Sequence, residues 1–114
     1  MTESKEKKTI LITGGAGFIG SHLCAKYLSE GHRVICIDNL QTTFAPKNIR
    51  EFFQNKNFTF RKHDIIDLLP IREKVDWIFN FACAGSYTSY QYDPVHTLKT
   101  NVIGMMNVLE TARK

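Results

Sequence analysis

Short apolar runs alternate with longer segments of helical periodicity along this chain. Four runs are rich in β-branched and aromatic residues and are bounded by turn-forming residues, which is typical of strands in a sheet. These predicted strands span residues 9–13, 33–37, 58–62 and 76–82. The third run alternates between apolar and polar residues, which favours a place near the edge of the sheet.

The segments between these runs predict helices. A first helix is expected over residues 18–30 and ends at Gly31, and a short one starts at Pro46 and runs through Phe53. A long helix is expected over residues 94–113, and its apolar residues share one face. Those residues are Val95, Leu98, Val102, Met105, Met106 and Leu109. Residues 39–46 read as a loop, and 64–72 as a loop or short helix.

Strands that alternate with helices predict an α/β fold with a parallel sheet and right-handed crossovers. The doubly wound arrangement places the four strands in the order 3-2-1-4, with helices on both faces. We expect one domain over residues 9–114, preceded by a disordered polar tail at residues 1–8. The fourth strand has no predicted fifth strand beside it, so an apolar edge is expected there.

A glycine-rich turn joins the first strand to the first helix. Gly15, Gly17 and Gly20 match GxGxxG, and Gly14, Gly17 and Gly20 match GxxGxxG. A glycine at position 17 would let a pyrophosphate approach the backbone, and Gly20 would let the helix lie close to the strand. The start of the helix would offer free N–H groups to the phosphates. Together these features predict a partial Rossmann fold that binds a dinucleotide; the alternative is a turn that only reverses the chain.

Two carboxylates follow later strands of the predicted sheet. Asp38 stands 18 positions after Gly20, at the end of the second strand. A carboxylate there can accept both adenosine ribose hydroxyls and would repel a 2′-phosphate, which predicts NAD rather than NADP. The alternative is a cap for the following turn. Asp64 follows the third strand and could contact the adenine edge, with Ile65 packed beside it, or it could be a solvated loop acid.

Composition and charge exclude several other classes of function. No apolar run approaches the ~20 residues that cross a bilayer, and the polar start does not resemble a signal peptide, so no membrane and a cytoplasmic location are expected. The net charge of +4 comes without a groove-reading motif, so nucleic-acid binding is not expected. The three cysteines are expected to be reduced thiols, and the four histidines form no metal-ligand pattern.

Several segments together resemble the extended short-chain dehydrogenase/reductase superfamily, also called NAD-dependent epimerases/dehydratases. They are TGGAGFIGSHL at residues 13–23, Asp38 with Asn39, HDI at 63–65, and SYQYDPVHTLKTNVIG at 89–104. The last segment is most similar to UDP-glucuronate decarboxylases, with dTDP-glucose 4,6-dehydratases as near relatives. The resemblance covers residues 9–114, which correspond to the N-terminal part of such an enzyme.

The resemblance implies a role for individual residues. The NAD-binding residues expected at the glycine turn are Gly14, Gly17, Phe18, Ile19 and Gly20, of which Gly17, Phe18 and Ile19 would contact the pyrophosphate. The other residues that the resemblance assigns to NAD are Asp38, Asn39 and Thr42 (adenosine ribose and its phosphate), Asp64 and Ile65 (adenine), Phe81, Ala82 and Cys83 (nicotinamide ribose), and Thr100. Lys99 would face a nucleotide-sugar substrate such as UDP-glucuronate, although a solvated helix lysine is the alternative. Tyr90 and Tyr92 are expected to be structural. Members of the superfamily are usually dimers, so a homodimer is expected, and non-specific association through the exposed edge of the fourth strand is the alternative.

The chain departs from the family pattern in three places. The decarboxylases usually carry DNxxTG, but here Thr43 stands in place of the glycine, and residues 83–86 lack the usual proline. The superfamily uses a Tyr-x-x-x-Lys pair for proton and hydride transfer. The residues four positions after the four tyrosines are Gly31, Gln91, Pro94 and His96. No catalytic residue is therefore assigned, and the chain is expected to bind more than it converts.

Three explanations of this missing pair are open. The chain could be a fragment of a full enzyme, which we favour, a truncated relative that binds NAD without turnover, or a chain completed by a separate partner. The function expected is the NAD-binding part of a UDP-glucuronate decarboxylase-like enzyme, which oxidises C4, decarboxylates and re-reduces its substrate. A dTDP-glucose 4,6-dehydratase, a nucleotide-sugar 4-epimerase and a non-catalytic NAD-binding module are the alternatives.

Overall fold

A computed structural model describes residues 6–40, 45–82 and 94–114 and contains one four-stranded parallel sheet. Its strands are β1 (Thr9–Thr13), β2 (Arg33–Asp38), β3 (Phe58–Lys62) and β4 (Trp77–Asn80). Their order is β3-β2-β1-β4, and each neighbouring pair is parallel. The predicted fold class and strand order are therefore confirmed, and β3 is an edge strand as expected.

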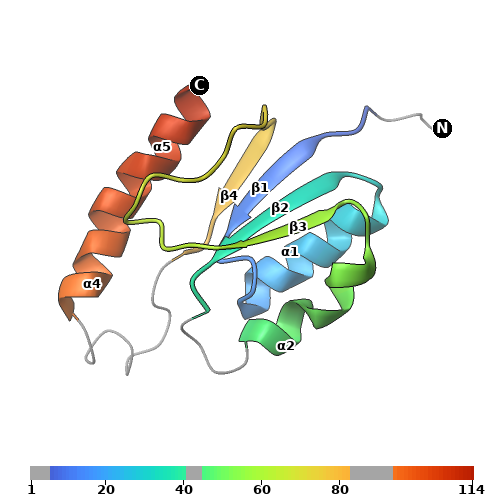
Figure 1. Cartoon of the computed structure of the whole chain (residues 1–114), viewed down its shortest axis with the longest axis horizontal. Helices are drawn as coiled ribbons and strands as arrows, with labels where there is room; N and C mark the ends of the chain where they lie inside the picture. The colour runs from blue at the N-terminus through green and yellow to red at the C-terminus, as the bar shows by residue number, and fades with distance from the viewer. Residues whose placement is uncertain (1–5, 41–44, 83–93) are drawn as a thin grey trace.

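Helices cover both faces of this sheet (Figure 1). The helices on one face are α1 (Phe18–Ser29), α2 (Ala45–Ile49) and the 3-10 turn η1 (Arg50–Gln54). The other face is covered by one continuous helical rod of α4 (Pro94–Lys99), the π-helical segment η2 (Thr100–Gly104) and α5 (Met105–Arg113). The sheet, including the carboxyl ends of its strands, therefore lies between the two helical layers.

The core follows from the alternation of side chains along the two central strands. Ile10, Ile12, Val34 and Cys36 pack toward α1, α2 and η1 in one apolar cluster. The residues between them form a second cluster with α5; its buried members are Leu11, Ile35, Ile37, Ile65 and Val108. Because successive side chains of a strand point to opposite faces, a strand covered on both sides must be apolar throughout. This explains the unbroken apolar runs in β1 and β2.

Several element boundaries differ from the prediction by one or two residues, most clearly those of β4 and α1. The fourth strand is shorter than residues 76–82, although the Asp76 and Phe81 amides still donate to the Thr9 and Thr13 carbonyls at 2.8 and 2.9 Å. The first helix ends at Ser29, and Gly31 follows it at φ +87°. A positive φ suits glycine and ends the helix as expected.

The long C-terminal helix does not pack on the sheet with the face that carries most of its large apolar residues. Thr100, Gly104 and Val108 are its buried residues, one helical turn apart. A Cβ at position 104 would overlap the Ile65 side chain, so this glycine allows the close approach. The predicted apolar stripe is present but exposed in the described structure; it comprises Val95, Leu98, Val102, Met105, Met106 and Leu109. Small residues, rather than the largest apolar ones, thus decide which face meets the sheet.

The buried cysteines match the expectation of reduced thiols. Cys24 on α1 and Cys36 on β2 are both free and fully buried, whereas Cys83 lies outside the described residues. The hydrogen bond with Cys24, together with burial, raises the pKa of the Cys36 thiol, so it stays protonated. Both residues act as small apolar groups in the core.

An ion pair beside β3 predicts a pH dependence of stability. The Arg61 guanidinium donates to both carboxylate oxygens of Glu73 at 3.1 and 2.5 Å, and this lowers the pKa of Glu73 from 4.5 to about 2. A depressed pKa stabilises the fold above the unfolded value of 4.5, and that contribution disappears as the pH falls toward about 2. We expect Glu73→Gln to flatten this acid-side loss in urea titrations at a series of pH values.

The matched control for this prediction is Glu51→Gln. Glu51 is exposed on η1 and makes no ion pair in the part of the chain that the structure describes. This variant should keep the acid-side slope of the wild type. If the Glu73→Gln and wild-type curves ran parallel over the acid range, the Arg61–Glu73 pair would not carry the effect.

Candidate functional site

The sequence-predicted site residues lie where the strands end, at one edge of the sheet (Figure 1). The glycine turn follows β1, Asp38 and Asn39 end β2, and the segments containing Asp64 and Phe81 follow β3 and β4. In an open parallel sheet this edge is where ligands bind. Ala82, Thr100 and Lys99 are also described, the last two on the helical rod, whereas Thr42 and Cys83 lie outside the described residues.

Two glycines of the turn are required by the fold itself. Gly14 has φ +69°, and a Cβ there would stand 2.5 Å from the Phe81 carbonyl oxygen and 2.8 Å from the Ala82 amide nitrogen. A Cβ at Gly20 would overlap the Gly14 carbonyl and stand 2.8 Å from the Cα of Gly15. These contacts bring the turn against the chain that leaves β4 and seat α1 on β1.

Gly17 differs because its φ is negative and a built Cβ would meet only one described atom, with no overlap. Its φ is −75°, and the nearest atom to a built Cβ is the Gly14 carbonyl oxygen at 3.3 Å. Gly17 is also the N-cap of α1, and no side chain caps this helix. Among the described residues no hydrogen bond takes the amides of Phe18 and Ile19, whose side chains are 75% and 61% exposed. An uncapped helix start beside a bare Cα fits a phosphate group.

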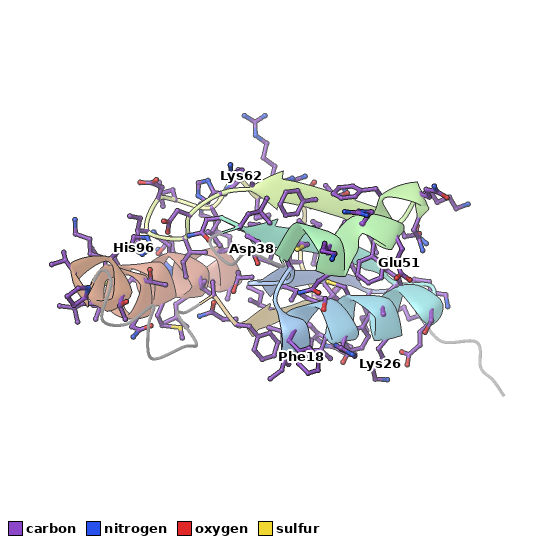
Figure 2. The ribbon with its side chains drawn as sticks, turned by 90° about the horizontal axis from the view of Figure 1, so that it is seen from below. Phe18, Lys26, Asp38, Glu51, Lys62 and His96 are labelled. Atoms are coloured by element: carbon purple, nitrogen blue, oxygen red, sulfur yellow. The ribbon has the colours of Figure 1, made fainter. Side chains whose placement is uncertain are left out.

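The exposed Phe18 side chain marks the outer border of this turn, pointing away from the sheet (Figure 2). Ile19 is likewise exposed, whereas the buried line of α1 consists of Gly20, Ser21, Cys24 and Leu28. The first apolar residues of the helix therefore contribute little to the core. Their exposure leaves the helix start accessible.

Asp38 connects the glycine turn to the end of β2. Its Oδ2 accepts a hydrogen bond from the Ala16 amide at 3.0 Å, and its Oδ1 accepts one from the Leu40 amide at 2.7 Å. The second bond is the turn cap that the sequence left as an alternative, and it holds Leu40 at φ 60°. Each carboxylate oxygen keeps a second acceptor position, so the cap leaves room for ribose hydroxyls.

Thr100 carries an unsatisfied polar atom at the start of η2. Its side chain is 8% exposed, and its Oγ1 is buried with no hydrogen-bond partner in the described structure. A buried polar group without a partner is destabilising, and π-helical turns are frequent at functional sites. The Thr100 hydroxyl is therefore a candidate hydrogen-bonding group for a ligand.

Lys99, the residue before Thr100, is exposed.

Asp64 already has several protein partners. Its carboxylate accepts hydrogen bonds from His96 Nε2 at 2.6 Å, the Ile66 amide at 3.1 Å and Asn39 Nδ2 at 3.4 Å. The Ile65 side chain is 2% exposed in the second core cluster, so any ligand contact of Ile65 would come from its backbone.

Two residues near the site were missed by the sequence analysis. Asn48 of α2 donates from Nδ2 to the Ala16 carbonyl at 2.8 Å and so fastens the glycine turn. His96 reaches Asp64 from 32 positions away in sequence. No local pattern indicates either contact, because each joins segments that are far apart in sequence. Asn48 meets the turn because α2 packs beside α1, and His96 meets Asp64 because α4 lies on the other face of the sheet.

Within the described ranges, no group of three or more His, Cys, Asp or Glu side chains is placed to hold a metal ion. None of the helices described is long and apolar enough to cross a lipid bilayer.

Comparison with known families identifies the fold. The model of the NAD dependent epimerase/dehydratase family matches residues 10–114. The chain belongs to this family. Among the relatives of this epimerase/dehydratase chain is UDP-glucuronic acid decarboxylase 1 of Danio rerio, 42% identical over 110 residues that make up 96% of this chain and 26% of the relative. UDP-glucuronic acid decarboxylase 4 of Arabidopsis thaliana is 41% identical over 92% of this chain and 23% of its own length.

Solved structures of epimerases and dehydratases share the same fold. An epimerase of Methanothermobacter thermautotrophicus superposes with a TM-score of 0.81 at 33% identity, covering 94% of this chain and 32% of that one. The dTDP-glucose 4,6-dehydratase DesIV of Streptomyces venezuelae, solved with NAD bound, gives a TM-score of 0.79 at 29% identity, covering 91% and 35%. The chain therefore spans about a quarter of these decarboxylases and about a third of these solved structures.

Proposed function

We propose that this chain binds NAD at the carboxyl edge of its sheet, as the cofactor-binding part of a UDP-glucuronate decarboxylase-like enzyme. The observation that carries the proposal is Gly17. It lies at an uncapped helix start, and the one contact that a built Cβ would make within the described chain is a tight 3.3 Å approach to the Gly14 carbonyl oxygen. A bound pyrophosphate would explain both the uncapped start and the missing side chain. The family membership and the identity to decarboxylases support the same reading.

Specific residues would hold the cofactor. The Gly17 backbone and the Phe18 and Ile19 amides would take the pyrophosphate, and Asp38 with Asn39 the adenosine ribose. The remaining proposed contacts are Thr42, Asp64, Ile65, Phe81, Ala82, Cys83 and Thr100, with Lys99 toward the sugar. When bound, NAD supplies a hydride acceptor for the sugar. This chain's share of the work is to bind and orient it.

The choice of substrate rests on the comparisons. The decarboxylases are 41–42% identical to this chain, whereas the epimerase and dehydratase structures described above are 33% and 29% identical. UDP-glucuronate is therefore the first candidate. A 4-epimerase or 4,6-dehydratase is the second, favoured by the fold likeness to those structures. A non-catalytic NAD-binding module is the third, because these 114 residues contain no Tyr-x-x-x-Lys pair.

The first test is calorimetric titration of the purified chain with NAD and, separately, with NADP. Saturable NAD binding with little NADP binding is expected. Absence of NAD binding would contradict the proposal. The sugar is tested on a longer protein containing this sequence: carbon dioxide release from UDP-glucuronate supports the decarboxylase, and a 4-epimer or 4-keto-6-deoxy sugar supports the second candidate. NAD binding without turnover of any sugar would support the module.

Thr100→Val tests the unsatisfied hydroxyl. Removing it should leave stability unchanged or raise it by up to about 1 kcal/mol, because Thr100 Oγ1 has no hydrogen-bond partner among the described residues. NAD affinity should fall roughly tenfold if the hydroxyl contacts the cofactor. Urea unfolding and calorimetry measure the two effects.

The same substitution at Thr111 is the control for this prediction. Thr111 Oγ1 donates to the Asn107 carbonyl at 3.0 Å on α5, away from the strand ends. Thr111→Val should slightly lower stability and leave NAD affinity unchanged. Wild-type NAD affinity in Thr100→Val would remove Thr100 from the site.

A further inference from the structure

Asn39, Asp64 and His96 form a hydrogen-bonded group that joins three segments at the carboxyl edge of the sheet. Asp64 Oδ2 lies 2.6 Å from His96 Nε2 and 3.4 Å from Asn39 Nδ2, and Oδ1 accepts from the Ile66 amide at 3.1 Å. The Asp64 and His96 side chains are only 26% and 21% exposed. Figure 2 shows His96 on α4, toward the end of the molecule where Asp38 ends β2.

His96 makes the strongest of these contacts. A short hydrogen bond to an ionised carboxylate is about twice as strong as a neutral one, whereas the 3.4 Å bond from Asn39 is long. Burial acts to raise the pKa of Asp64, but the hydrogen bonds from His96 and the Ile66 amide outweigh it, and the pKa lies below its ordinary value. The Asp64 carboxylate is therefore ionised and can only accept hydrogen bonds, so His96 Nε2 carries the proton between them.

The remaining capacity of Asp64 has a definite chemical preference. A carboxylate offers about four acceptor positions, and three are taken by protein donors, which leaves one on Oδ1. That position can accept an N–H of the 6-amino group of adenine. It would face the carbonyl oxygen of a 6-oxopurine such as hypoxanthine, where two acceptors repel. Selection between the two bases then depends on how firmly the carboxylate is oriented.

We propose that His96 is a positioning residue that orients Asp64, so that the site selects a 6-aminopurine dinucleotide over a 6-oxopurine one. The inference rests on the proposed function, because it requires a dinucleotide whose base lies beside Asp64. It adds a specificity-determining residue on α4, which lies across the sheet from α1 and α2. This residue does not itself contact the base.

The experiment compares NAD with nicotinamide hypoxanthine dinucleotide, measuring both dissociation constants and the melting temperature of each variant of the chain. The wild type should prefer NAD by about tenfold or more. His96→Leu and His96→Asn should lose most of this preference, since leucine cannot donate and asparagine is too short. His96→Gln, which can place an N–H near the Nε2 position, should keep most of it. In an Asp64→Asn background, His96→Leu should leave the ratio unchanged.

The outcomes separate positioning from a merely structural role. If His96→Asn weakens both dinucleotides equally, or neither, the proposal is overturned while NAD binding stands. A wild type that binds both equally would also overturn it, because Asp64 would not read the 6-position. Should the leucine variant fail to fold, the glutamine and asparagine variants still decide the question. A wild type that binds neither dinucleotide would refute the proposed function itself.

Discussion

Gly17→Ala should abolish NAD binding while leaving the fold intact. The φ of −75° is one that alanine adopts freely, and the new Cβ would stand 3.3 Å from the Gly14 carbonyl oxygen, a tight contact that a small shift of this turn relieves. Alanine is a poorer N-cap than glycine, so we expect a stability loss of about 1 kcal/mol or less. The same methyl group would occupy the space over the α1 start where a pyrophosphate must approach. NAD affinity should fall at least about 100-fold by calorimetry.

Gly14→Ala is the matched control for this prediction. Position 14 has φ +69°, and its Cβ would stand 2.5 Å from the Phe81 carbonyl oxygen, a distance that requires the backbone to move. We expect a loss of several kcal/mol, comparable to the whole stability of a small domain, visible as lost secondary structure in circular dichroism. Wild-type NAD affinity in Gly17→Ala would show that no pyrophosphate lies over Gly17.

Changes at Asp38 should alter the choice between NAD and NADP. Asp38→Ala removes the acceptors for the Ala16 and Leu40 amides, each worth about 1 kcal/mol, so stability and NAD affinity should both fall. Asp38→Asn keeps the shape and one acceptor oxygen but removes the charge that would repel a 2′-phosphate. We expect NAD to bind roughly tenfold more weakly in Asp38→Asn and the NADP-to-NAD ratio of dissociation constants to approach one.

The ratio of the NADP and NAD dissociation constants is the decisive readout, because a general loss of stability would weaken the binding of both cofactors alike. Glu51→Gln removes one negative charge from the exposed surface of η1 and should leave the ratio at its wild-type value. An unchanged ratio in Asp38→Asn would assign Asp38 to the turn cap alone. The cap is already present in the structure, so that result would leave the fold explained and the ribose contact unsupported.

The local features of the fold could be predicted from the chain itself. The apolar runs of β1 and β2 and the helix stop at Gly31 each depend on side chains close together in sequence. The alternation of these elements with helices leaves few topologies, and the observed strand order follows. Asp38 could be placed at the site for the same reason, since it directly ends a strand whose carboxyl end lies beside the glycine turn.

The sequence by itself therefore determined the elements, their order around the sheet and the edge at which the candidate site residues gather. Only the tertiary structure decided that small residues such as Gly104 meet the sheet while the apolar stripe stays exposed, and that His96 reaches Asp64. It also distinguished two glycines of the turn. Position 14 must be a glycine because a Cβ there would overlap the Phe81 backbone, whereas a Cβ at position 17 would make no such overlap. Periodicity reports which residues share a face, but contacts between distant segments depend on how closely two backbones approach. That approach is set by packing across the whole sheet.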